Sequence, residues 1–251
     1  MRADVGRVRA VGRYVRRSGP GYVAAKAATY LAPWALGRTG AVGDPFVADL
    51  ARHLGLPVAS VADPNVAEVV EHVAQPETLL VSVSCPLKLG VPLLEAADLG
   101  AVNVHSSPLP AYAGLAPYLW VLANGETTTA VTVHEMEERF DTGAILASPQ
   151  VPIRPGASMI ELFLEQAVAG GHALAEVVDA VVRDGALPSG RTQDLTRRSY
   201  HGMPTMDAVR SVRSHGHRLV ARRDVAAYRE ALRRVAAPSR PAPGVAAPSS
   251  A

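Results

Sequence analysis

Two polar residues with complementary chemistry stand two positions apart near the middle of the chain. The segment AVNVH at 101–105 has the pattern of a strand, which would point Asn103 and His105 to one face. An amide can donate a hydrogen bond to an oxygen that becomes negative during a reaction, and an imidazole can donate or carry a proton. The pair therefore fits a reaction with an oxyanion intermediate. On spacing alone, a structural role is the more common explanation, with Asn103 capping a turn and His105 in the core.

A carboxylate in a glycine-ended turn is the third candidate. Asp141, in the segment FDTG, falls on a short loop between two predicted strands. There it could bond to an imidazole or receive a proton through water. A purely turn-forming role that leads the chain to Gly143 explains it equally well.

Metal and serine chemistry have weaker support. His134, on a neighbouring predicted strand, would complete a zinc ligand set with His105 and Asp141, but the H-x-x-x-H spacing of a helical metal site is missing. Ser106 and Ser107 lack the G-x-S-x-G elbow of a serine hydrolase. We therefore expect neither a metal site nor a serine nucleophile.

The elements that must hold these residues alternate in type from residue 44 onward. Such alternation implies an α/β fold, with a mostly parallel sheet covered by helices on both faces and ligands bound at the carboxyl ends of the strands. The Pro- and Gly-containing segment 106–115 is expected to be irregular. Strands are predicted at 57–61, 79–84, 101–105, 129–136 and 144–153, and helices at 7–18, 21–36, 44–53, 64–74, 91–97, 116–122, 158–182, 205–214 and 224–235.

Composition divides the chain into four segments. Residues 1–43 form a basic helical N-terminal segment, 44–186 the sheet domain, and 187–236 an Arg-rich helical extension. The Pro-, Ala- and Ser-rich tail at 237–251 cannot bury enough apolar surface to become ordered. Solvated helix faces explain the basic ends better than nucleic acid does, so no nucleic-acid partner is expected.

Length, hydropathy and cysteine content narrow the class of protein. The 251 residues are 48% hydrophobic, which suits one large α/β domain with additions. No apolar run reaches the ~20 residues that span a bilayer, so no membrane partner is expected. The single cysteine, Cys85, excludes an intrachain disulfide and fits a reducing cytoplasm.

The central segment as a whole resembles the folate-dependent formyltransferases. In that family a strand ends in N-x-H-x-S-x-L-P, Y-x-G follows, and D-T-G comes one strand later. This chain carries all three motifs, in NVHSSPLPAYAG and FDTG, and the match covers about residues 44–183. The resemblance implies a Rossmann-like formyltransferase fold with 44–186 as its catalytic domain. The matching positions are Asn103, His105, Ser107, Leu109, Pro110, Tyr112, Gly114 and Asp141 to Gly143.

The resemblance also implies roles for the three candidates. Asn103 and His105 would stabilise the oxyanion formed when an amine attacks the formyl carbon of 10-formyltetrahydrofolate. Asp141 would hold the imidazole and help to move the proton that the amine releases. Such a transfer needs bound reactants, an oxyanion stabiliser and a proton route, but no metal. The pterin ring would lie against two loops, formed by Ser84, Cys85, Pro86, Leu87, Lys88 and Leu89 and by Glu137, Glu138, Arg139 and Phe140.

The acceptor is the least constrained part of the resemblance. Family members usually have a basic residue in place of Ala113 and often a glycine in place of Arg139, so their acceptor contacts are not carried over. The residues after 186 are too few for the C-terminal barrel of the tRNA formyltransferases. The stretch SYHGMP at 199–204 resembles a less characterised branch, for which a small amine such as an amino sugar is the expected acceptor. The alternatives are a methionyl-tRNA formyltransferase, a non-catalytic folate-binding relative and a formyl hydrolase.

The opening of the chain departs from the family pattern. Members begin with a strand, a tight turn and a helix, which supply the centre of the sheet and part of the folate wall, whereas this sequence begins with basic helices. The fold is therefore expected to lack the first strand-helix-strand unit. A start further upstream is the favoured explanation, because a sheet without its central strand leaves backbone groups and apolar surface uncovered.

Overall fold

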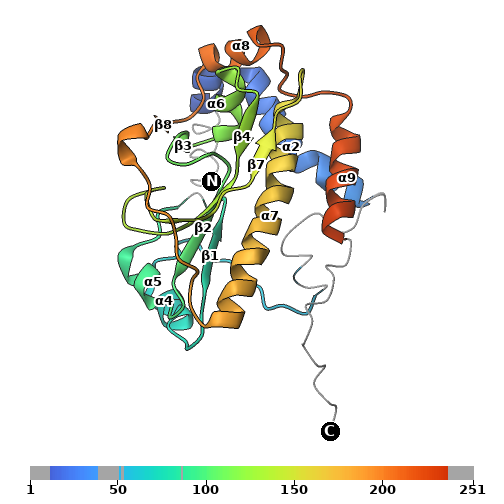
Figure 1. Cartoon of the computed structure of the whole chain (residues 1–251). Coiled ribbons are helices and arrows are strands. Elements are labelled where there is room, and N and C mark those ends of the chain that lie inside the picture. The colour runs from blue at the N-terminus through green and yellow to red at the C-terminus, as the bar shows by residue number, and fades with distance from the viewer. Residues whose placement is uncertain (1–11, 39–50, 52–53, 86, 237–251) are drawn as a thin grey trace.

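The computed structural model describes residues 12–38, 51, 54–85 and 87–236 (Figure 1). A helical stretch at 12–18 precedes the first labelled helix. The helices are α2 (Pro20–Arg38), α4 (Ala67–Val73), α5 (Val91–Ala96), α6 (Pro117–Ala123), α7 (Met159–Asp184), α8 (Met206–Ser214) and α9 (Asp224–Ala236), with a short 3-10 helix at Leu195–Arg197. The strands are β1 (Leu80–Val83), β2 (Ala101–His105), β3 (Ala113–Gly114), β4 (Thr128–Ala130), β5 (Thr132–Glu135), β6 (Ile145–Ala147), β7 (Gln150–Pro152) and β8 (Tyr200–His201). No helix among these residues is long and apolar enough to cross a membrane.

A four-stranded sheet in the order β1-β2-β5-β6 forms the centre of the molecule. β1 runs parallel to β2, whereas β5 pairs with β2, and β6 with β5, in antiparallel orientation. The α/β class is confirmed, but the described sheet is mixed, and only its β1–β2 half shows the expected parallel pairing. The connections explain this difference. Helix α5 carries the chain between β1 and β2, while the loop between β5 and β6 is too short for a crossover helix.

The predicted strand 129–136 is divided into two. β5 joins the central sheet, while β4 pairs with β7 in a separate two-stranded sheet. Between them, the backbone N–H of Val131 donates to the carbonyl of Pro149. The predicted strand 144–153 is divided in the same way into β6 and β7. Each of these alternating segments therefore contributes strands to two different sheets. Asp141 lies on the loop between β5 and β6, as expected.

Helix α7 packs against one face of the sheet at β2, β5 and β6 (Figure 1). Its start is fixed by a capping box, in which the Ser158 side chain accepts from the Glu161 N–H and the Glu161 side chain accepts from the Ser158 N–H. Its approach to the sheet is close at Gly170, where an added Cβ would lie 2.9 Å from a methyl of Val104 on β2. Val102 and Val104 thus face α7, which leaves Asn103 and His105 on the opposite face, as predicted.

The opposite face is only partly covered. Leu80 of β1 packs against a small cluster that α4 and α5 contribute, including Val73 and Leu93. This cover lies at the end of the sheet where β1 and β2 begin. Asn103 and His105 lie toward the other end of β2, where loops rather than helices surround them.

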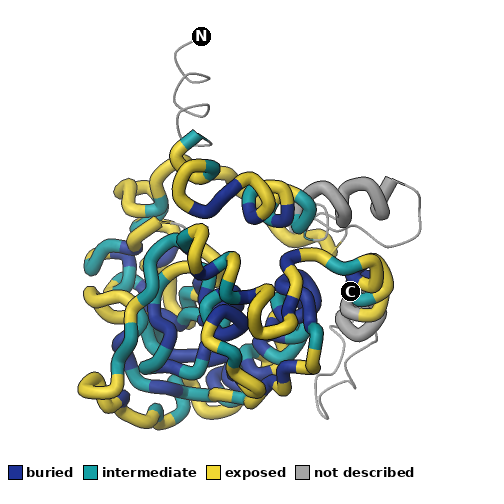
Figure 2. The backbone as a smooth tube through the Cα atoms, turned by 90° about the horizontal axis from the view of Figure 1, so that it is seen from above, coloured by how far each residue is buried: buried dark blue, intermediate teal, exposed yellow. Residues whose placement is uncertain are grey.

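The C-terminal extension packs against the sheet domain. β8 pairs in parallel with β3, which is a short strand inside the segment 106–115 that was expected to be irregular. Helix α8 lies beside α6, and the Ser211 hydroxyl donates to the Ala123 carbonyl. Helix α9 lies beside α7, and the Ser158 hydroxyl donates to Asp224 at 2.5 Å. Figure 2 shows buried segments on the sheet domain and on the elements packed against it, and the largest buried cluster holds Tyr22, Leu122, Leu162, Val212 and Tyr228. The extension is therefore part of the same packed structure.

Four expectations fail or fall outside the described residues. The predicted strand 57–61 is irregular and exposed, with Val58 and Val61 about half accessible to solvent, because no described strand pairs with it. Strand β1 was expected to be buried, but Val83 is 58% exposed because α7 does not extend over it. The predicted helix 44–53 and the tail 237–251 lie almost wholly or wholly outside the described residues.

Candidate active site

Strand pairing fixes the orientation of Asn103. The register of β2 and β5 places Asn103 opposite His134, and the Asn103 amide nitrogen lies 3.2 Å from Nε2 of His134. The other ring nitrogen of His134, Nδ1, lies 2.7 Å from the carbonyl oxygen of Glu135. Because a carbonyl only accepts, Nδ1 carries the hydrogen, and Nε2 accepts from the amide. One amide hydrogen of Asn103 is thus held by His134, and the second remains for a ligand.

His105 lies between a backbone carbonyl and a carboxylate. Its Nε2 donates to the Tyr112 carbonyl at 3.1 Å, and its Nδ1 lies 3.7 Å from Oδ1 of Asp141. The second distance is too long for a hydrogen bond, although a small movement on ligand binding would close it. The two side chains are only 9% and 10% exposed, so water screens their interaction weakly. The arrangement can pass a proton between carboxylate and imidazole.

The Asp141 carboxylate reaches across the site. Its Oδ2 accepts from the backbone N–H of Gly114 at 2.9 Å, and its Oδ1 lies 3.9 Å from Nε2 of His134. Its own turn is held by another side chain, since the Thr142 hydroxyl donates to the carbonyl of Arg139. The turn-forming explanation of Asp141 therefore does not account for its contacts. The three sequence candidates, Asn103, His105 and Asp141, come together at one edge of the sheet.

Local backbone geometry explains the D-T-G sequence. Asp141 has a left-handed backbone with φ of 58°, which is uncommon for a residue with a side chain. At Gly143 a Cβ would lie 2.1 Å from the Glu135 carbonyl oxygen, so only glycine fits beside β5. This close approach brings the start of β6 against β5 and aims the preceding carboxylate at the site.

Burial keeps the neighbouring histidine neutral. The pKa of His134 is lowered from its ordinary value of 6.5, chiefly because burial disfavours the charged ring. The sequence suggested His134 only as a zinc ligand, because the register that places it beside Asn103 is not visible in a strand pattern. The Nδ1 hydrogen of His134 is used on the Glu135 carbonyl and its Nε2 lone pair on the Asn103 amide, so both ring nitrogens already have partners other than a metal. Across the described residues, no group of three His, Cys, Asp or Glu side chains has the arrangement of a metal site.

An aromatic cluster supports the loop that follows β2. The Tyr112 ring stacks on His201 of β8 with 5.2 Å between centroids, and Trp120 lies 4.8 Å from the same ring. The Tyr112 hydroxyl donates to Glu126 at 2.5 Å, and burial together with this bond raises the pKa of Tyr112 to about 12. The sequence matched Tyr112 to a family motif, but it gave no sign that His201 would stack on it.

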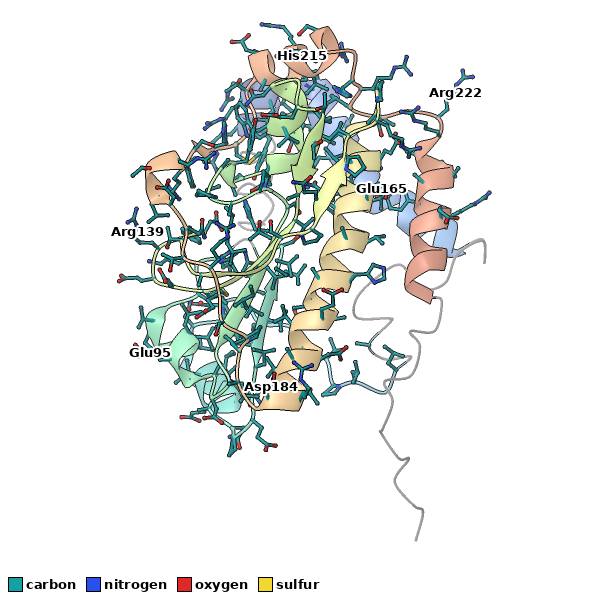
Figure 3. All side chains as sticks on the ribbon, viewed as in Figure 1. Glu95, Arg139, Glu165, Asp184, His215 and Arg222 are labelled. Carbon is teal, nitrogen blue, oxygen red and sulfur yellow. The ribbon has the colours of Figure 1, made fainter. Side chains whose placement is uncertain are left out.

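The two predicted donor loops flank the candidate residues. The loop after β1 leaves the sheet beside the end of β2, and Ser84, Cys85, Leu87 and Lys88 are exposed there, while Leu89 is buried in the α4–α5 cluster. Pro86 lies outside the described residues. On the second loop, Glu137, Glu138, Arg139 and Phe140 are partly or largely exposed, and Arg139 lies at the outer edge of the molecule (Figure 3). Because Leu89 is buried in a separate cluster, its side chain does not line the site.

The candidate site thus has an amide, an imidazole and a carboxylate gathered at one edge of a mixed sheet. The family model described as formyl transferase matches residues 33–178, which is more than half of the chain. The chain therefore belongs to the formyl transferase family.

Curated relatives support the same family. The chain is 42% identical over 108 residues to a methionyl-tRNA formyltransferase of Synechococcus sp. (strain JA-3-3Ab), covering 43% of this chain and 33% of the relative. It is 36% identical over 146 residues to that of Myxococcus xanthus (strain DK1622), covering 57% and 46%. The chain thus spans a third to a half of the length of these relatives.

Solved structures share the fold. A sugar N-formyltransferase from Shewanella sp. FDAARGOS_354 superimposes with a TM-score of 0.52 at 20% identity, covering 67% of this chain and 71% of that one. An N-formyltransferase from Helicobacter canadensis gives a TM-score of 0.51 at 16% identity, covering 64% and 62%. At these identities the likeness establishes the Rossmann-like formyltransferase fold.

Proposed function

We propose that this protein transfers a formyl group from 10-formyltetrahydrofolate to the amino group of a small molecule. The observation that carries the proposal is the convergence of Asn103, His105 and Asp141 at one sheet edge, with the amide of Asn103 held by His134 at 3.2 Å. These three residues supply an oxyanion donor, a proton carrier and a carboxylate. Family membership supports the same chemistry.

The reaction follows from the roles of these groups. The amine nitrogen attacks the formyl carbon, and the carbonyl oxygen becomes an oxyanion that the second hydrogen of the Asn103 amide stabilises. The His105 Nε2–H already bonds to the Tyr112 carbonyl, so this ring stabilises the oxyanion by the positive charge that it gains on taking up a proton at Nδ1. The attacking nitrogen loses a proton toward Asp141, which lies 3.7 Å from the imidazole. The bond between the formyl carbon and N10 of the folate then breaks, and N10 takes up a proton. The products are a formamide and tetrahydrofolate.

The donor site is proposed at the two flanking loops. Other members of the fold have been solved with folinic acid, in the Helicobacter canadensis enzyme, and with tetrahydrofolate, in the formyltransferase PseJ from Anoxybacillus kamchatkensis. The exposed loop residues Ser84, Cys85, Leu87 and Lys88 and the exposed residues Glu137 to Phe140 lie on either side of the candidate catalytic residues, where a donor must place its formyl carbon. Backbone groups of these loops can pair with a pterin ring.

An amino sugar carried on a nucleotide is the acceptor that we propose. The Helicobacter canadensis structure holds dTDP-3-aminofucose, and the PseJ structure holds a UDP-linked formamido sugar. In this chain, exposed Tyr200 lies beside Gly114, and the Arg198 guanidinium lies 5.3 Å from the Tyr200 ring. An exposed ring next to a cation suits a ligand with a flat group and phosphates. Initiator methionyl-tRNA is the alternative, since the curated relatives bear that name.

Formyl transfer with a panel of acceptors tests the proposal. The protein is incubated with 10-formyltetrahydrofolate and, separately, with dTDP-amino sugars, UDP-amino sugars and charged initiator tRNA, and tetrahydrofolate release is followed together with the mass of the acceptor. A gain of the formyl mass on a sugar amine supports the proposal. Formylation of the tRNA alone supports the alternative. Formate release without an acceptor indicates a hydrolase, and donor binding without turnover indicates a non-catalytic relative.

A further inference from the structure

We propose that Gln193, on the C-terminal extension, is a positioning residue that holds the Asp141 carboxylate in place relative to Gly114 and His105. This inference rests on the proposed function, because it assigns Gln193 to the formyl-transfer site. The segment that carries it is anchored next to β6, where Arg191 and Ile145 exchange two backbone hydrogen bonds of 2.8 and 2.9 Å. Gln193 is therefore brought to the turn that precedes β6.

The amide of Gln193 bridges two carbonyls of that turn. Its nitrogen donates to the carbonyl of Gly143 at 2.7 Å and to the carbonyl of Asp141 at 3.2 Å. Only an NH₂ group can face two carbonyl oxygens, so the orientation of the amide is chemically determined. Both of its hydrogens are used on the backbone that carries the catalytic carboxylate.

The amide oxygen of Gln193 indicates that a glutamine at this position lowers the stability of the fold. The residue is only 6% exposed, and its Oε1 is buried without a hydrogen-bond partner among the described residues. A buried amide oxygen without a partner disfavours folding, so an apolar side chain of similar size would avoid that penalty. A glutamine at this position is better explained by the two bonds that its nitrogen makes than by stability.

The bridge acts on a strained turn. Asp141 has φ of 58°, and its carboxylate must reach the Gly114 N–H at 2.9 Å while staying 3.7 Å from His105. Without the bridge, the Asp141 carbonyl is free to rotate, and the carboxylate moves with it. A displacement of about 1 Å at a catalytic group can cost about 10²-fold in rate. Gln193 therefore serves catalysis through Asp141, without needing to touch the substrate.

Paired substitutions test this role. Gln193→Leu removes both donors at similar volume, and we expect kcat to fall about ten- to a hundredfold while the donor KM stays within about twofold. In the background of Asp141→Asn, the same change should lower kcat by less than about twofold, because both act through one carboxylate. Gln75→Leu, on an exposed glutamine whose amide donates to the Glu71 carbonyl, is the matched control and should leave kcat unchanged.

A spectroscopic readout keeps the test independent of turnover. The Gly114 amide proton, which bonds to the Asp141 carboxylate, should shift upfield and exchange faster in Gln193→Leu, and the same change is expected in Asp141→Asn. If the wild-type protein transfers no formyl group, the proposed function fails, and the Gly114 signal still decides whether Gln193 positions Asp141. An unchanged Gly114 signal, or full additivity of the two substitutions in kcat, would overturn the role of Gln193. Loss of stability with kcat intact would do the same.

Discussion

The two walls of the candidate site differ in how they are held. Asn103 and His105 lie on a strand that is paired on both sides, and each side chain has a defined hydrogen-bond partner. The loop after β1, by contrast, follows a strand that is paired on one side only within the described sheet, and most of the loop's described residues are exposed. The candidate catalytic side chains Asn103 and His105 therefore lie on a rigid strand, whereas the proposed donor contacts lie on a loop.

This difference assigns different tasks to the two regions. A transition state is stabilised only by groups already in place, which suits paired strands backed by a helix. A donor can instead be bound by a loop that adjusts to it. Substitutions in the first region should therefore act on kcat, and substitutions in the second on donor affinity. Substitutions that change kcat and donor affinity separately can test this assignment.

The largest effect is expected at the imidazole. His105→Ala removes the group that stabilises the oxyanion and carries the proton, and we expect kcat to fall about 10²–10³-fold with little change in the donor KM. Steady-state tetrahydrofolate release measures both values. His172→Ala, on an exposed face of α7, is the matched control. A rise in donor KM with kcat unchanged would place His105 in donor binding instead.

The rigidity of the catalytic strand can be tested at two adjacent glycines of α7. At Gly170 an added methyl would lie 2.9 Å from a methyl of Val104, whereas at Gly171 nothing lies within 4 Å. We expect Gly170→Ala to destabilise the fold by about 1 kcal/mol or more through overpacking, and Gly171→Ala to stabilise it by up to about 1 kcal/mol through helix propensity. Thermal denaturation gives the two signs. Equal shifts for both variants would mean that α7 does not press on β2.

Two properties should depend on His134, namely the kcat of transfer and the change of protein stability with pH. Removing it in His134→Leu leaves the Asn103 amide without its acceptor, and we expect kcat to fall about fivefold, the equivalent of one hydrogen bond of about 1 kcal/mol. Its pKa is lowered in the folded protein, so the unfolded state binds more protons and stability rises with pH. The wild type should therefore lose stability as pH falls below the unfolded value of 6.5 toward the lowered folded pKa. The His134→Leu variant should lose the part of this slope that His134 supplies; an identical slope would contradict the assignment.

The smallest effect is expected on the exposed loop. Leu87→Ala removes an apolar side chain that is 44% exposed, and we expect the donor KM to rise a few-fold, about 0.5–1 kcal/mol, with kcat unchanged. Val182→Ala, on a residue 80% exposed near the end of α7, controls for loss of surface apolar area. A fall in kcat without a change in KM would show that this loop takes part in the chemical step.

Much of the fold could be predicted because its signals are local. The strand at 101–105 and the helix begun at Ser158 follow from alternation, amphipathicity and capping, and both were placed within two residues. The segment 57–61 has a strand composition but no partner among the described residues, and a strand needs one. The division at Val131 also depends on pairing with a distant segment. Such pairings are tertiary and leave no local trace.

The candidate site shows the same limit. Asn103, His105 and Asp141 could be recognised because the motifs contain them, but the partners that orient them could not. His134 meets Asn103 through the register of two antiparallel strands, and Gln193 meets Asp141 across fifty positions of sequence. Neither contact can be predicted from a fixed spacing between residues in the sequence. Sequence thus indicated the candidate catalytic groups, and the structure adds the residues that hold them.

Donor binding and transfer measured together on Asn103→Ala test the central claim most directly. The variant is titrated with a stable 10-formyltetrahydrofolate analogue, and thermal stabilisation is compared with that of the wild type, since ligand at a hundred times its Kd adds about 2.7 kcal/mol. We predict the same stabilisation in both proteins and a kcat about 10²–10³-fold lower in the variant. Stabilisation that disappears with Asn103, or transfer that survives without it, would contradict a transfer site built on this strand.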